Sequence, residues 1–311
     1  QNIKKLPFYT DVSGAVLYHH ENADGTGTFG KRWDEIPLFA RIIHLCDMVD
    51  VMGNSCDFSG ESWIRAKEYV CRNRNILFDS ECADAFLEVF SEENFVSMSQ
   101  DRFEDELWKK IPRDKRDCDF ETCKGIADFF AGIVDYKSEF TGKHSLGVAK
   151  KAAELAEYMG YSQADIEKFY MAGALHDIGK MAIGNEILEK PGRLTDEEFS
   201  RMKNHAGYTY MILSEVKDFD EVRDWAALHH EKLDGTGYPF GKKAEELNEP
   251  ERLMACVDIY QALTEARPYK SGMSHDKACS ILEDMVQKGW IDAAVTDKLR
   301  SCFDVGGRDM V

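Results

Sequence analysis

The residues of this chain that are best suited to chemistry are histidines and aspartates between positions 144 and 258. The set is His144, His176, Asp177, His205, His229, His230 and Asp258. Neutral imidazoles and carboxylates are the ligands that iron, manganese or zinc takes when a site must keep positions open for water. A His-His pair and a His-Asp pair together exceed what one ion needs. The set therefore predicts a two-metal site, which suits in-line attack on a phosphodiester.

The His176-Asp177 pair follows an apolar run, residues 172–175, so we expect it at a helix end that faces a core. A buried aspartate without a partner is costly, and a metal ion removes that cost. Adjacent side chains on a helix point about 100° apart, so the pair can serve two ions. Lys180 lies about one turn further on, where its ammonium can hold a phosphate oxygen and stabilise transition-state charge. We assign catalytic roles to Asp177 and Lys180.

Several of these residues have ordinary interpretations when each is taken alone. His144 precedes an amphipathic segment, so by itself it would be interpreted as a helix cap or a polar surface group. Lys180 by itself would be interpreted as a solvent-exposed lysine. Asp258 lies in an apolar helix, where a buried hydrogen bond or a salt bridge with Arg252 would explain it. The metal interpretation is favoured because it explains the whole set at once.

The segment from Asp234 to Pro239 is the one stretch that reads as extended, because its glycines, threonine and proline oppose a helix. Glycines permit a close backbone approach, and Pro239 stiffens the loop. We expect this loop to lie over the metal site. Asp234, Gly235 and Tyr238 are therefore predicted substrate contacts, and we add Arg252 to them.

Helical patterns dominate the elements that must position these residues. Apolar residues recur at helical spacing from Val148 to Met159, and Gly160 fits a helix C-cap. Thr195 and Glu198 form a capping-box pattern that opens a helix carrying His205. We also expect a helix from Phe120 to Val134 and one that Ser274 caps and that runs to Gly289. The predicted fold class is all-α.

Composition bounds the class of protein. The chain has 311 residues, 43% of them hydrophobic, and a formal net charge of −18, which disfavours a nucleic acid polymer as partner. Nine scattered cysteines without a Cys-x-x-Cys pair favour reduced thiols and a cytoplasmic location. We expect no membrane span and no signal peptide. The first residue is not methionine, so the sequence leaves open whether the chain is part of a longer protein.

A segment of the sequence is repeated. Residues 19–27 (HHENADGTG) resemble residues 229–237 (HHEKLDGTG), and residues 41–47 parallel residues 252–258, with Arg and Asp six positions apart in both. We expect two copies of one domain, 1–117 and 118–311, which meet at the charged stretch 111–117. The first copy has no His-Asp pair and no equivalent of His144 or His205. We expect it to be degenerate or partial, a helical scaffold without catalytic function.

The second copy resembles a known family, the HD-GYP phosphodiesterases of the HD metal-dependent phosphohydrolase superfamily. The resemblance is carried by ordered blocks: His144, residues 176–180 (HDIGK), 188–195 (LEKPGRLT), 202–205 (MKNH), 229–239 (HHEKLDGTGYP), Asp258 and 266–270 (ARPYK). Residues 8–90 resemble the same family more weakly, as in its tandem subtype. The family's glutamate four residues before the first histidine is replaced here by Phe140, so we expect two metal ions and no third.

The resemblance implies an all-helical fold and a site of iron or manganese whose ligands are the seven residues named first, with Asp177 bridging the ions. It implies hydrolysis of a cyclic dinucleotide, chiefly cyclic di-GMP, to the linear pGpG or to GMP, with Asp177 or a histidine assisting the leaving 3′ oxygen. Arg267, Tyr269 and Lys270 would contact phosphate or base. GGDEF-type proteins are possible partners, and a homodimer is possible.

Three other interpretations stay open at this point. The substrate can be 3′,3′-cyclic GMP-AMP, which some members of the family hydrolyse. A second alternative is a receptor that binds a cyclic dinucleotide without hydrolysing it. The complete set of metal-ligand residues argues against it, because a receptor has no need to retain all of them. The chain can also be a general HD phosphohydrolase that acts on nucleotides, which the intact Gly-Tyr-Pro block disfavours.

Overall fold

The computed structural model describes residues 6–8, 11–54, 59–98, 118–137, 144–266 and 271–304, with isolated positions 3, 107, 109 and 111. The chain forms two compact units, residues 1–117 and 118–311. The described residues form helices and turns, with isolated bridges and no strand among them, so the all-α prediction is confirmed. No helix among these residues combines the length and the apolar character that a membrane crossing requires.

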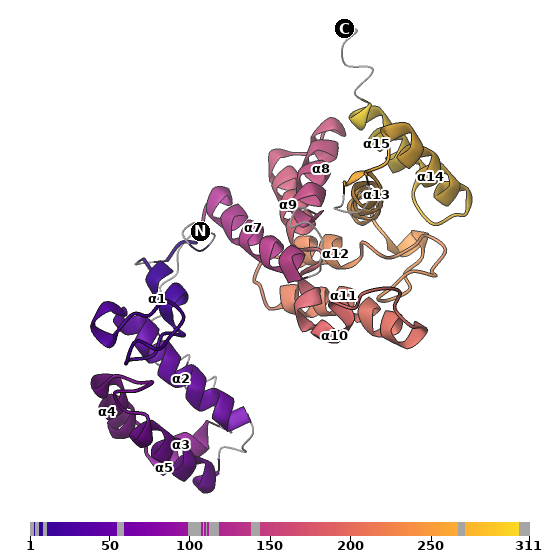
Figure 1. Cartoon of the computed structure of the whole chain (residues 1–311). Helices are drawn as coiled ribbons and strands as arrows, with labels where there is room; N and C mark the ends of the chain where they lie inside the picture. Colours follow the sequence, from indigo (N-terminus) through magenta and orange to yellow (C-terminus); the bar gives the residue numbers. More distant parts are fainter. Residues whose placement is uncertain are drawn as a thin grey trace. The chain divides into compact units, whose positions relative to one another are not determined.

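Unit 1 consists of short helices around a small core (Figure 1). Its described helices are α1 (Ser13–Tyr18), the 3-10 turn η2 (Trp33–Glu35), α2 (Leu38–Asn54), α3 (Gly60–Arg72), α4 (Ser80–Val89) and α5 (Glu92–Ser97). The ring of Trp63 contacts those of Phe86 and Phe95 in the core, both in a tilted arrangement. Asp79 caps α4 by accepting hydrogen bonds from the backbone of Glu81 and Cys82.

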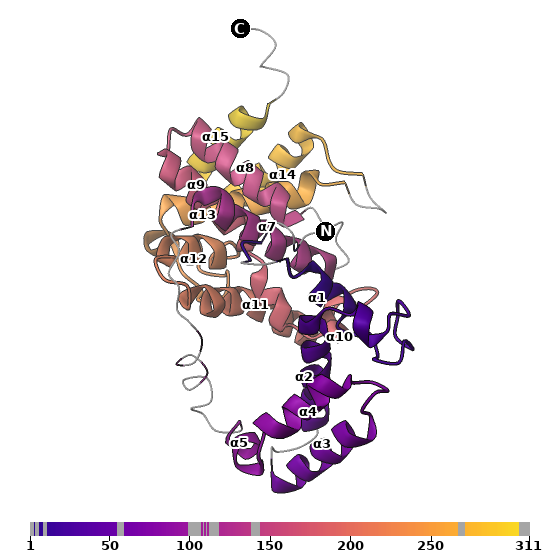
Figure 2. The same ribbon diagram turned by 90° about the vertical axis from the view of Figure 1, so that its left-hand side faces the viewer.

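Unit 2 is a larger helical bundle (Figure 1, Figure 2). Its described helices are α7 (Phe120–Lys137), α8 (His144–Tyr158), α9 (Gln163–Leu175), η3 (Ile178–Ala182), α10 (Asn185–Leu188), α11 (Asp196–Ser214), α12 (Asp220–Ala227), η4 (Ala244–Glu246), α13 (Glu249–Thr264), α14 (His275–Gln287) and α15 (Ala293–Phe303). The helices α8, α9 and α13 pack together and carry most of the unit's core.

The centre of unit 2 is packed closely because small residues line its helices. A Cβ atom on Gly173 of α9 would lie 2.6 Å from the Cα atom of Ala149 in α8, so the two helices meet backbone to backbone there. Ala152 and Ala156 continue the same small face of α8 and are fully buried. These contacts hold the helix ends, from which the histidines project, at fixed separations.

Local signals in the sequence account for most helix boundaries. The Thr195–Glu198 capping box is present, and Gly160 has the positive φ expected of a C-cap. The predicted helix at residue 120 also forms, as α7. Ser274 does lie at the N-cap position of α14, but its side chain makes no capping hydrogen bond, so that detail of the prediction was wrong.

Candidate metal centre

The histidines and carboxylates predicted to bind metal surround one small cavity in unit 2. The cavity has a volume of about 140 Å³, and its lining is His144, His176, Asp177, Lys180, His229, His230, Asp258 and Ala262. His205 lies beside it, with its Nε2 atom 3.4 Å from Oδ1 of Asp177. The predicted ligands come from α8, the end of α9, α11, the end of α12 and α13, so the tertiary fold assembles them.

The ligand atoms fall into three overlapping groups, each with its atoms within 4.8 Å of one another. The groups are His205 with His229 and His230, His144 with His176 and Asp258, and His176 with Asp177 and His229. His176 and His229 each belong to two groups, so the groups form one continuous cluster. The cluster therefore offers more ligand atoms than one four-coordinate ion takes.

Three of the histidines are held in the orientation that a metal ligand needs. The Nδ1 atoms of His176, His205 and His229 lie 2.8, 2.7 and 2.6 Å from the carbonyl oxygens three residues earlier. A carbonyl only accepts, so Nδ1 carries the proton and Nε2 keeps its lone pair. In His205 and His229 this Nε2 atom is buried and has no hydrogen-bond partner. Buried lone pairs of this kind are costly unless a cation meets them, so these residues fit a divalent metal.

The ionisation of these groups also suits cation binding. Burial lowers the pKa of His230 to about 4 and holds the pKa values of His205 and His229 below the usual value, so these rings stay neutral. Burial alone would raise the pKa of Asp177, but His176 and Lys180 hold it well below its usual range. Although burial opposes it, hydrogen bonds to Asp258 and Glu265 raise the pKa of His144 to about 10, and the charge of Asp177 raises the pKa of His176. At neutral pH three of the imidazoles, His205, His229 and His230, are therefore neutral and lie beside an ionised carboxylate.

Lys180 lies on the wall of the cavity with its Nζ atom 2.6 Å from Oδ2 of Asp177. The two side chains are one turn apart, as the sequence predicted, and the lysine side chain is 19% exposed. The ammonium thus brings positive charge to the cavity and also fixes one oxygen of Asp177.

The turn that carries His176, Asp177 and Lys180 is fastened to α11. The hydroxyl of Thr209 accepts a hydrogen bond from the backbone of Gly179 and donates one to the carbonyl of His176. A Cβ atom on Gly179 would lie 2.0 Å from the carbonyl oxygen of His205, so glycine is required for this approach. The contact sets the separation of His205 from Asp177.

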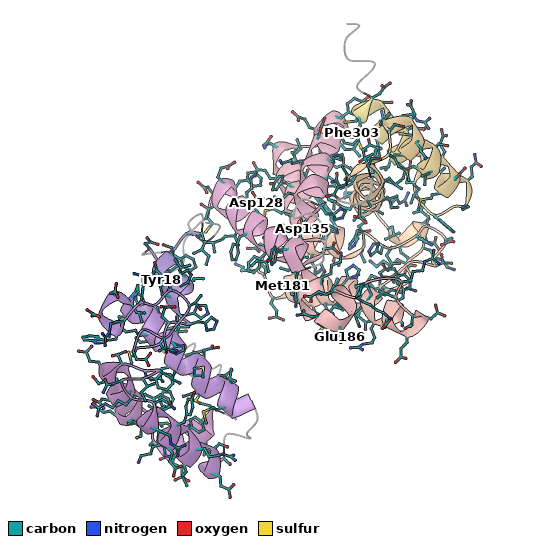
Figure 3. The ribbon with its side chains drawn as sticks, in the orientation of Figure 1. Tyr18, Asp128, Asp135, Met181, Glu186 and Phe303 are labelled. Carbon is teal, nitrogen blue, oxygen red and sulfur yellow. The ribbon has the colours of Figure 1, made fainter. Side chains whose placement is uncertain are left out.

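His144 begins α8, and a residue of α7 anchors that helix start. Asp135, labelled in Figure 3, is 2% exposed and accepts hydrogen bonds from the backbone and the hydroxyl of Ser145. This carboxylate satisfies donors at the start of α8 that the helix itself leaves unpaired. The bonds fix where His144 enters the site.

The loop after His230 is folded around a buried carboxylate. Glu231 is 3% exposed and accepts from the backbone N–H groups of Phe240, Gly241 and Lys242. The ring centroids of Tyr238 and His230 are 4.7 Å apart, so this part of the loop borders the cluster of candidate ligands. Burial raises the pKa of Tyr238, so its hydroxyl stays protonated and can donate a hydrogen bond.

The other predicted substrate contacts lie elsewhere or outside the described residues. Arg252 donates to the carbonyls of Ala244 and Leu247 and pairs with Asp292, so its contacts are structural. Asp234 accepts from the backbone and hydroxyl of Thr236 within its own turn. Neither these two residues nor Gly235 lines the cavity. Arg267, Tyr269 and Lys270 lie outside the described residues.

Sequence reasoning missed the residues that hold the ligands in place. They are Asp135, Thr209 and Glu231. Glu231 could have been found, because its equivalent Glu21 stands in the repeated segment. The others carry no local signal, because each acts on a residue of a different helix.

Comparisons with known proteins agree with this geometry. Residues 128–295 match the family described as the HD domain. The chain is 32% identical over 305 residues to 3′3′-cGAMP-specific phosphodiesterase 1 of Vibrio cholerae serotype O1, which covers 95% of this chain and 70% of that protein. It is 40% identical over 167 residues to a cyclic di-GMP phosphodiesterase of the same organism, which covers 49% of this chain and 34% of that protein.

A solved structure has a similar fold. The crystal structure of a cyclic GMP-AMP specific phosphodiesterase of V. cholerae matches with a TM-score of 0.64 and 27% identity, over 98% of this chain and 70% of that one. The family match spans more than half of the chain, and the similarity to the first relative spans nearly all of it. This chain therefore belongs to the HD domain family and, within it, to the HD-GYP phosphodiesterases.

Proposed function

We propose that this chain hydrolyses a phosphodiester bond of a 3′,3′-cyclic dinucleotide at a two-metal centre in unit 2. The observation that carries the proposal is the pair of buried Nε2 lone pairs on His205 and His229, which point into a cluster that also holds Asp177. Proteins that are similar to this chain are named as cyclic dinucleotide phosphodiesterases. The proposed ligands are His144, His176, Asp177, His205, His229, His230 and Asp258.

Bound divalent ions, iron or manganese by the choice of ligands, would supply Lewis-acid activation of water and of the phosphoryl group. The chain's own residues then set the charge balance. Lys180 adds a positive charge at the cavity wall, where the phosphate oxygens gain negative charge during attack. Asp177 has a strongly lowered pKa, so it serves as a ligand and not as the acid that protonates the leaving 3′ oxygen.

The size of the cavity suits this role. At about 140 Å³ it is smaller than the 300 Å³ or more that sites for a whole small-molecule ligand usually need. It therefore holds the scissile phosphate, and the nucleosides lie outside it. The Tyr238 loop is one candidate for those outer contacts. Arg267, Tyr269 and Lys270, predicted from the sequence to contact phosphate or base, are others.

The test is product formation by anaerobically purified, iron- or manganese-loaded protein, with substrate and linear product separated by chromatography. Asp177→Ala should lose both metal and turnover. The matched control is Asp47→Ala, because Asp47 stands at the position of Asp258 in the repeated segment of unit 1. Full turnover by Asp177→Ala would refute the site. Tight nucleotide binding by metal-loaded wild type without any product would favour a receptor.

A preference for 3′,3′-cyclic GMP-AMP over cyclic di-GMP is the second candidate. The relative and the solved structure that match nearly the whole chain are both specific for cyclic GMP-AMP, whereas the cyclic di-GMP enzyme aligns with 49% of it. Assaying both substrates side by side settles the order. A higher kcat/KM for cyclic di-GMP would reverse this preference without affecting the proposed reaction.

For unit 1 we propose a non-catalytic role as a degenerate copy. Among its described residues no group of three potential ligands comes within the distance seen in unit 2. A cytoplasmic location is supported by the free cysteines found throughout the described residues. GGDEF-type partners and a homodimer stay predictions, which co-purification and light scattering would test.

A further inference from the structure

One carboxylate at the metal centre has no role in the site as described so far. Glu265 directly follows α13 as its C-cap residue, and its side chain is only 8% exposed. Its Oε2 atom lies 3.0 Å from Nδ1 of His144, although 121 positions separate the two residues in sequence. A carboxylate held this far from water requires a partner, and the histidine ring provides one.

The position of His144 explains why it needs such a partner. The other buried histidines, at 176, 205 and 229, bond Nδ1 to a carbonyl three residues earlier, within or at the end of their own helix. His144 is the first residue of α8, so no preceding turn of that helix can supply a carbonyl. Glu265 supplies the acceptor from another helix.

The opposite side of the His144 ring faces the proposed centre. Its Nε2 atom lies 3.1 Å from Oδ1 of Asp258, and both atoms belong to one candidate ligand group with His176. The ring thus lies between two carboxylates, one inside the ligand cluster and one outside it. An acceptor on Nδ1 keeps a proton on that atom, so a cation that binds the ring does so at Nε2, in place of the proton that faces Asp258.

We propose that Glu265 is a positioning residue that holds His144 in the tautomer and the orientation needed to bind metal. This inference rests on the proposed function, because it assumes that His144 is a ligand. Glu265 acts through its hydrogen bond to Nδ1 and does not itself bind the ion. Since a carboxylate on a ligating imidazole strengthens that ligand, its loss weakens the metal site while leaving the other ligands in place.

The test is a titration of metal-free protein with Mn²⁺, with free Mn²⁺ measured by electron paramagnetic resonance and bound metal counted after dialysis. Glu265→Ala should weaken the binding of at least one ion by about 10- to 100-fold. Glu265→Gln should recover most of the affinity, because the amide oxygen can still accept from Nδ1. The matched control is Glu249→Ala, at the other end of α13, where the carboxylate pairs with Tyr161.

The outcomes separate this inference from the proposed function. Wild-type affinity in Glu265→Ala would overturn the positioning role and leave the metal-dependent reaction standing. Equal weakening in Glu265→Gln and Glu265→Ala would also overturn it, because a direct ligand, unlike a hydrogen-bond acceptor, needs the charged carboxylate. Wild-type protein that binds no metal would refute the proposed function, and the inference with it.

Discussion

Two loops of this chain, one in each unit, share their sequence pattern and their hydrogen bonds. The rings of His19 and His20 are 4.0 Å apart, as are those of His229 and His230. Glu21 accepts from the backbone of Phe29 and Lys31, as Glu231 does from its own loop. These features therefore belong to the folding of the loop, and among the described residues of unit 1 they bring together no group of three candidate ligands.

The units differ in what surrounds the loop. In unit 2, α8, α9 and α11 supply His144, His176 and His205, and α8 and α9 pack against α13. The repeated positions show the contrast, because Ile42 of α2 is 43% exposed whereas its equivalent Leu253 is fully buried. Ile42 lines an apolar groove of about 400 Å³ between α2 and α4. Among the described residues, the repeated segment lies beside a cluster of candidate ligands only in unit 2, where further helices add histidines.

The largest expected difference in turnover between the two units comes from replacing the first histidine of each His-His pair. His229→Ala should reduce turnover by at least about 100-fold, because loss of a ligand exceeds the 10- to 100-fold cost of losing a supporting hydrogen bond. His19→Ala should change turnover by less than about twofold. Metal content and initial rates of both variants give the answer. Similar losses in the two variants would mean that unit 1 takes part in the reaction.

The buried glutamates Glu21 and Glu231 should contribute about equally to stability. Only Glu231 should also affect turnover. Glu231→Gln and Glu21→Gln should each lower the free energy of unfolding by about 2 kcal/mol, since an amide cannot accept from all of the N–H groups. Only Glu231→Gln should also lower turnover, because its loop carries Tyr238. Urea unfolding and rates would be measured together. A rate loss in Glu21→Gln would contradict the division of roles.

Metal should stabilise one unit only. A ligand that binds only the folded protein at 100 times its Kd adds about 2.7 kcal/mol of stability, and Mn²⁺ should add it to unit 2 alone. Hydrogen exchange followed by mass spectrometry, with and without chelator, would show slower exchange in α8–α13 and no change in α1–α4. Protection of α1 and α2 by metal would reveal a site that the described residues of unit 1 do not show.

The smallest expected effects are those of Arg252 and Arg41, which occupy equivalent positions in the repeated segment. Arg252 bonds two carbonyls and Asp292, whereas Arg41 pairs with Asp79 at 3.2 Å. Arg252→Ala should cost about 1–2 kcal/mol of stability, and Arg41→Ala somewhat less, with KM unchanged in both. Thermal unfolding and steady-state kinetics distinguish this from a substrate contact. A raised KM in Arg252→Ala at unchanged stability would restore the role predicted from sequence.

The fold class and the grouping of the seven candidate ligands could be predicted because their signals are local. Helix periodicity, the Thr195 capping box and the apolar run before His176 each depend on neighbours within a few residues. Most of the ligands also stand in short recognisable blocks, so no knowledge of distant contacts was needed to select them.

The supporting residues could not be predicted because their partners are distant in sequence and common in type. Glu265 follows α13 like many helix-end glutamates, and only the tertiary fold brings it to His144. Arg252 illustrates a different case. It was predicted as a substrate contact, and in the structure it pairs with Asp292, as Arg41 pairs with Asp79 in unit 1.

The short-range hydrogen bonds of His176, His205 and His229 have a consequence for metal exchange. Each bond forms within one helical turn or at its end, so it is made when the helices form and does not wait for a cation. The rotational entropy of these rings is then lost on folding and not on binding. Binding and release of metal should therefore be reversible without refolding of the protein. Which ion occupies the centre should depend on the concentrations of the metal ions that are available.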